Sequence, residues 1–175
     1  TITVKGYAEK NIKSDIAYWT VWVSSKSEVV SNAYDQVKNM KSRIYDFLHQ
    51  EGYLDSAISE GNVETYPVYG LNPQGYQTGE IVGYTVQTSI KVSSNDVYKV
   101  ESSSKNIFEL LGEGVNFNSN PPQYYVSNLD KYKLDMLSLA LADAKNRANE
   151  IAKGTQNKIG QLKYARQGIF QITAS

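Results

Sequence analysis

The sequence predicts an α+β fold in which helices pack on one face of an antiparallel sheet. Short segments in which apolar and polar residues alternate occur along most of the chain, as in half-buried strands. Three longer segments carry apolar residues at spacings of three and four, the period of an amphipathic helix. Two strands joined by a short loop precede each of these helices, which favours antiparallel pairing. The predicted order is β-β-α-β-β-α-β-β-α-β.

The clearest element is a long helix from Asn128 to Lys153. Its apolar stripe consists of Leu137, Leu141, Ala144, Ala148 and Ile151. Asn128 is expected to cap the first turn with its side chain, and Gly154 to end the helix in the left-handed conformation. Because the rest of the chain is rich in strand signals, we expect a sheet beneath this helix.

The first half of the chain predicts strands at 2–9 and 16–25 and a helix at 31–51. Ser31 or Asn32 is expected to cap this helix, and Gly52 to end it. One face of the second strand is apolar: Ala17, Trp19, Val21 and Val23. The other is unusually apolar for a solvent face: Ile16, Tyr18, Thr20 and Trp22. Either that second face is also covered, or it is an interface. The helix stripe consists of Ala33, Val37, Met40, Ile44, Phe47 and Leu48.

The middle of the chain predicts a long hairpin. A strand at 58–69, which Pro67 weakens or places at a sheet edge, is followed by a loop at 70–80 and a strand at 84–92. The remaining predictions are a helix at 95–111 and strands at 115–118, 123–127 and 159–166. Residues 168–175 give no clear signal.

Composition bounds the class of protein. The chain has 175 residues, 41% of them hydrophobic, which suits one domain or two closely fused halves. Eighteen basic and eighteen acidic residues balance, which argues against a nucleic-acid surface built on net charge. There is no cysteine, which excludes disulfides and thiol catalysis. Since the chain opens on a strand-like segment without an initiator Met, we expect a processed form whose N-terminal targeting or anchoring segment is gone.

No catalytic signature is present. The single histidine, His49, near the end of the first predicted helix, is interpreted as a surface residue that the helix dipole favours. No second histidine exists to build a usual zinc site, and there is no Gly-x-Ser-x-Gly elbow or P-loop. The sequence therefore predicts no catalytic, cofactor-binding or metal-binding residue. An unfamiliar carboxylate or tyrosine site is the least favoured hypothesis.

Fourteen tyrosines are the compositional oddity, and several surround residues 66–84. In one interpretation these tyrosines cover their own strands. In the other, the segment packs on a neighbouring subunit or a ligand, as exposed aromatic groups on long loops often do. The candidate interaction residues are Tyr66, Tyr69, Leu71, Tyr76, Ile81 and Tyr84.

Several segments together resemble the SIMPL-domain family across nearly the whole chain. Val4–Glu9 looks like the opening strand of the family with its Gly-x-Ala, and Ser14–Ala17 is similar to its Pro-Asp-x-Ala turn, with Ser in place of Pro. Ile81–Tyr84 resembles the Gly-Tyr before the central strand. The Ala-rich helix over 137–148 and the following Gly160 resemble the third helix of the family.

The resemblance implies a single SIMPL-like domain over 1–175 in a bacterial protein that is periplasmic or anchored to the membrane facing the periplasm. One periplasmic immunogenic member assembles into a large ring- or channel-like oligomer, and others are linked to oxidative-stress tolerance. No catalytic residues are implied. Family members usually close with a further strand after the loop that follows Gly160, and no obvious strand is found there in this sequence. Either the chain is truncated or the sheet lacks that strand and has an exposed edge that invites pairing.

The favoured hypothesis is a non-enzymatic exported protein that self-assembles through its sheet edge and tyrosine-rich segment. The alternative is a periplasmic small-molecule binding protein that uses the 66–84 hairpin and whose ligand is unknown. A tyrosine-lined pocket would favour this alternative.

Overall fold

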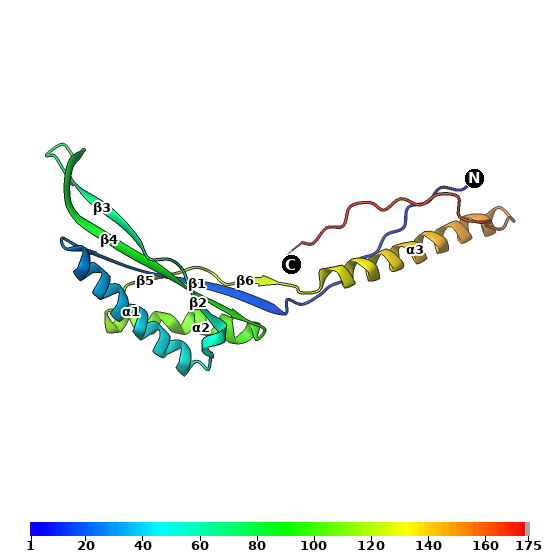
Figure 1. The fold of residues 1–175 in the computed structure, drawn as a ribbon. Helices are drawn as coiled ribbons and strands as arrows, with labels where there is room; N and C mark the ends of the chain where they lie inside the picture. The colour runs from blue at the N-terminus through cyan, green and yellow to red at the C-terminus, as the bar shows by residue number, and fades with distance from the viewer. Residues whose placement is uncertain (174–175) are drawn as a thin grey trace. The chain divides into compact units, whose positions relative to one another are not determined.

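The computed structural model describes residues 1–173 and confirms an α+β protein (Figure 1). The contacts divide the chain into two compact units. The sheet unit is Ser14–Tyr125, and the terminal unit combines Thr1–Lys13 with the chain from Val126 onward. The prediction of one domain over 1–175 stays a prediction.

The sheet unit is built around two long antiparallel strands. β1 (Ile16–Ser27) pairs with β4 (Gln77–Ser94), with Val21 opposite Ile90. Four shorter strands flank this pair, all antiparallel: β2 (Ile58–Glu60) and β3 (Glu64–Leu71) on β4, and β5 (Phe117–Ser119) and β6 (Gln123–Tyr125) on β1. The antiparallel sheet that the sequence predicts is therefore confirmed.

The predicted hairpin exists with different boundaries. The strand expected at 58–69 is split, because Glu60 lies opposite Ile90 and Glu64 opposite Gln87, so that the segment between β2 and β3 has one residue more than the facing part of β4. The prediction of a loop at 70–80 is wrong, since β3 continues to Leu71 and β4 begins at Gln77. Backbone pairing between the two strands accounts for the shorter turn.

Two helices cover one face of this sheet (Figure 1). α1 (Val30–Gln50) begins after Val29, without the side-chain cap expected from Ser31 or Asn32. It ends as predicted at Gly52, whose φ of 89° is left-handed. α2 (Val97–Asn106) begins at Asp96, whose carboxylate accepts from the Lys99 N–H (3.0 Å). The chain then tightens into a 3₁₀ helix over Ile107–Glu113.

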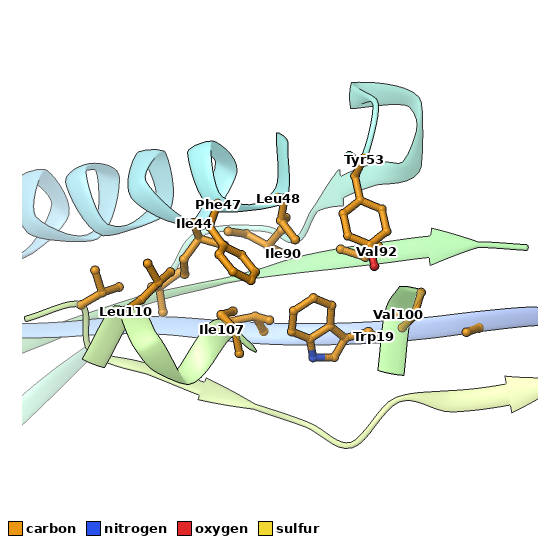
Figure 2. Packing of buried hydrophobic residues seen from close by; sticks show 14 residues of the cluster. Trp19, Ile44, Phe47, Leu48, Tyr53, Ile90, Val92, Val100, Ile107 and Leu110 are labelled. Atoms are coloured by element: carbon orange, nitrogen blue, oxygen red, sulfur yellow. The ribbon is translucent and has the colours of Figure 1, made fainter. Parts of the chain in front are cut away.

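The core lies between the sheet and these helices (Figure 2). The predicted inner face of β1 is completely buried: Ala17, Trp19, Val21 and Val23. In Figure 2, Ile44, Phe47 and Leu48 of α1 point toward β4 and toward Ile107 and Leu110. The outer face of β1 is half-buried, partly by contacts within the sheet. There the Tyr18 ring meets Tyr125 edge-on at 5.6 Å, and Lys91 Nζ lies 4.7 Å from the Tyr18 ring centroid.

The terminal unit contains α3 (Leu129–Gly154) and two extended segments that lie along it. Strands were expected at 2–9 and 159–166, and both predictions are wrong: within the described residues neither segment belongs to a sheet. The predicted inner face of 2–9 nevertheless exists. Val4 and Ala8 are half-buried, and Gly6 approaches the backbone of Ala140. This segment packs on a helix instead of pairing with a strand.

The continuous helix predicted at 128–153 is confirmed as α3. The expectation that a sheet lies beneath it stays a prediction. α3 belongs to the terminal unit, and the sheet to the other. Ala152 is its buried residue, whereas four of its aliphatic side chains are about half exposed or more: Leu134, Leu139, Leu141 and Ile151. The helix begins at Asn128 as predicted, although this residue has φ 59° and makes no side-chain cap. Gln156, and not Gly154, takes the left-handed conformation after the helix.

Candidate interaction site

The predicted interaction residues lie on one hairpin, residues 64–84, which we call the arm. Its strands are β3 and the first part of β4. The last pair between β1 and β4 is Ser27 with Tyr84, so β4 is paired with β3 alone over 77–83 (Figure 1). Two-stranded hairpins are marginally stable in water unless a third strand or a helix supports them. The outer part of the arm is therefore the least supported part of the sheet.

The arm exposes large apolar side chains. The exposed fraction is 70% for Leu71, 72% for Tyr76 and 48% for Ile81, and Tyr69 and Val82 are exposed as well. These residues lie on either side of one turn, on the paired strands β3 and β4 or in the turn itself. A cluster of this kind on a soluble protein is typical of a surface that contacts another molecule.

At the base of the arm the side chains are better engaged. Tyr66 Oη donates to Glu64 Oε2 (2.8 Å), and Gln87 Nε2 donates to the same oxygen (2.8 Å). These two bonds lower the pKa of Glu64, and the bond to the carboxylate raises the pKa of Tyr66. Tyr84 is half-buried beside the end of β1. The structure thus places four of the six predicted residues on the outer arm and two, Tyr66 and Tyr84, at its base.

Hydrogen bonds of Asn72 close the turn at the tip, and its backbone N–H donates to the Tyr76 carbonyl (2.9 Å). Asn72 Oδ1 accepts from the backbone N–H groups of Gln74 (3.1 Å) and Tyr76 (2.9 Å). Gly75 follows with φ 85°, a conformation that favours glycine. The tip is consequently ordered, and it presents Leu71 and Tyr76 in a defined way.

The polar clusters of the sheet unit are surface contacts that fasten α1. Glu60 of β2 accepts from Lys41 (2.8 Å) and Tyr45 (2.8 Å), both on α1. Burial and this bond raise the pKa of Tyr45 to about 12. His49 lies 2.6 Å from Asp55, and both side chains are largely exposed. His49 therefore sits on the surface near the end of the helix, as predicted.

Sequence reasoning missed a buried polar cluster between α1 and α2. Tyr53 Oη donates to Ser103 Oγ (3.1 Å), which donates to Glu51 (3.1 Å). Burial raises the pKa of Tyr53, and Lys99 Nζ lies 4.6 Å from its ring centroid. Ser103 could have been found, because it falls between Val100 and Ile107 at helical spacing and so shares their buried face. The cluster joins the end of α1 to α2.

Shallow depressions are present on the described surface of each unit. The first is lined by Val4, Lys5, Asn146, Arg147, Glu150 and Ile151. The second is lined by Ser104, Phe108, Ser119, Asn120, Pro121 and Pro122. None of these residues belongs to the arm. A tyrosine-lined pocket, which would have favoured small-molecule binding by the arm, is not found in either depression.

No group of three or more His, Cys, Asp or Glu within residues 1–173 could hold a metal ion. In the same part of the chain, no helix is long and apolar enough to cross a bilayer.

The fold and its surface define an α+β protein with an exposed apolar arm at one end of an antiparallel sheet. A family model, SIMPL, described as a protein of unknown function (DUF541), matches residues 2–172. The chain therefore belongs to the SIMPL family, as its sequence motifs indicated. No curated protein matches it in sequence.

Proposed function

We propose that this protein is a non-enzymatic, exported bacterial protein that self-assembles into oligomers, with the arm as one of its contact surfaces. The observation that supports this best is the outer arm, where β4 has β3 as its sole partner and Leu71, Tyr76 and Ile81 are exposed. Such a ribbon gains support and loses exposed apolar surface when it packs on another molecule. Membership of the SIMPL family supports export to the periplasm or its membrane surface.

A role in the cell envelope or in oxidative-stress tolerance is part of this proposal and is supported by the family resemblance. A deletion strain that is sensitive to peroxide, and that the full-length gene rescues, is the expected result. If the triple variant Leu71→Ser, Tyr76→Ser, Ile81→Ser fails to rescue this strain, the role is linked to assembly.

Assembly is tested by light scattering and sedimentation of the full chain over a range of concentrations. We expect the wild type to be oligomeric. The triple variant Leu71→Ser, Tyr76→Ser, Ile81→Ser should shift the distribution toward the monomer while the far-UV circular dichroism stays the same. Removing this apolar area should weaken association by about tenfold or more, since each buried aliphatic or aromatic side chain contributes about 1.5–3 kcal/mol.

The matched control replaces exposed apolar residues elsewhere on the sheet unit: Leu54→Ser, Tyr98→Ser and Phe108→Ser. This control should assemble like the wild type. A wild type that is monomeric at every concentration would overturn the proposal. If the two triple variants weaken assembly equally, the arm is not a specific contact surface.

A further inference from the structure

The formal net charge of the chain is zero because its two units carry opposite net charges that cancel. The terminal unit carries eleven Lys and Arg against five Asp and Glu, a net charge of +6. The sheet unit carries seven basic residues against thirteen acidic ones, a net charge of −6. Surfaces of opposite sign attract over distances longer than a contact and favour one orientation of encounter. Two copies of this chain therefore carry complementary charge on different parts of their surface.

The basic charge includes the segment that follows α3. Residues 158–173, which we call the tail, contain Lys158, Lys163 and Arg166 and no acidic residue. The arm shows the opposite pattern, with Glu64 and Glu80 and no basic residue. The charge difference between the two units is thus found again in two extended segments, one from each unit.

The tail also has the form of a strand that lacks a partner. It belongs to no sheet within the described residues, and its backbone groups make no hydrogen bond there. Three of its apolar side chains are among the most exposed in the protein: 77% for Leu162, 77% for Tyr164 and 96% for Ile169. Ile159 and Phe170 are half-buried. Extended segments with free backbone groups bind readily along another strand, and their side chains decide which one.

We propose that the basic tail of one copy docks on the acidic arm of a second copy. Each molecule then donates one tail and receives another. Such a contact joins two different surfaces, so a series of them closes into a ring or continues as a filament. This inference rests on the proposed self-assembly and names the second surface that the arm requires.

A charge exchange in the full chain tests the proposal by sedimentation velocity at low ionic strength. The tail variant is Lys163→Glu with Arg166→Glu, and the arm variant is Glu64→Lys with Glu80→Lys. Each alone should associate about tenfold or more weakly than the wild type, because like charges then face each other across the contact. An equimolar mixture of the two variants should recover the assembly, since each reversed tail meets a reversed arm. A single chain with all four substitutions should recover it as well.

The matched control is Lys131→Glu with Lys145→Glu on α3, which changes the net charge by the same amount outside the tail. It should assemble like the wild type. If Glu64→Lys disturbs the base of the arm, as circular dichroism would reveal, Glu80→Lys alone is used, because the Glu80 carboxylate makes no hydrogen bond within the described residues.

The outcomes separate the two proposals. A monomeric wild type overturns self-assembly and this inference with it. A wild type that assembles while the tail and arm variants behave like it, or a mixture that stays dissociated, overturns the tail–arm contact alone. A control that dissociates as much as the tail variant also overturns it, since net charge would then be sufficient.

Discussion

Gly6 lies against the backbone of α3 so closely that a Cβ atom at this position would overlap the carbonyl oxygen of Ala140. The neighbouring Tyr7 N–H donates to Asp143 Oδ2 (2.8 Å), one turn further along the same helix. The small side chains of Ala140 and Ala144 leave room for this approach. Residues 2–9 are thereby held on α3 by one glycine and one charged acceptor.

Gly6→Ala should release this segment from the helix. The added methyl group meets backbone and cannot be accommodated by a rotamer change, and overpacking of this kind costs about 1–3 kcal/mol. Hydrogen exchange of residues 2–9 and limited proteolysis should both become faster. Gly160→Ala in the same unit, where a Cβ finds open space, is the control and should leave exchange unchanged. Equal behaviour of the two variants would contradict the packing described.

Ser119→Ala should destabilise the sheet unit. Trp19 is fully buried, and its indole Nε1–H donates to Ser119 Oγ (2.8 Å). Without the hydroxyl the buried donor has no partner, which costs about 1–3 kcal/mol. Urea unfolding followed by circular dichroism measures this loss. Asn118→Ala, at the exposed neighbouring position of β5, should change the free energy of unfolding by less than about 0.5 kcal/mol.

Acid should weaken the link between β2 and α1. The bonds from Lys41 and Tyr45 lower the pKa of Glu60 in the folded state. A lowered folded pKa gives stability that is present above the ordinary glutamate pKa and is lost as the pH falls through the folded value. The half-exposed pair limits the effect to about 0.5–1 kcal/mol. Glu60→Gln should reduce the loss of folding stability at low pH, as measured by urea unfolding at several pH values. Glu28→Gln, on the exposed surface, is the control and should leave this loss unchanged.

Gly75→Ala should strain the tip of the arm. Its φ of 85° is left-handed, and a side chain there costs about 1–2 kcal/mol. Because β4 is paired with β3 alone near the tip, the strain should appear as faster hydrogen exchange over 69–82 without a change in global unfolding. Gly79→Ala, with open space and no left-handed φ, provides the comparison within the same hairpin. A global loss of stability would show that the arm is not a separate region.

Local pattern in the sequence was sufficient for most of the sheet unit. Ala17, Trp19, Val21 and Val23 are buried because a strand places alternate residues on one face, whatever lies opposite. The stripe of α1 is buried for the equivalent helical reason, with Met40 the partly buried member. Family membership could also be predicted, because it follows from motifs in sequential order. The six interaction candidates follow from composition, since aromatic residues flank one turn, and their role as contact residues stays a prediction.

The partner of each apolar face was decided by tertiary structure alone. Periodicity shows that Val4, Gly6 and Ala8 share a face, but it does not tell whether a strand or a helix covers that face. In the structure Gly6 of this face lies against the helix α3. The same limit applies to α3, because its predicted stripe includes Leu141 and Ile151, which are about half exposed. Where β1 stops pairing and leaves the arm on two strands depends on register between distant segments, and so does the meeting of Tyr53 with Ser103. Local sequence encodes which side of an element is apolar, whereas the neighbour that covers it is selected by competition among all surfaces of the chain.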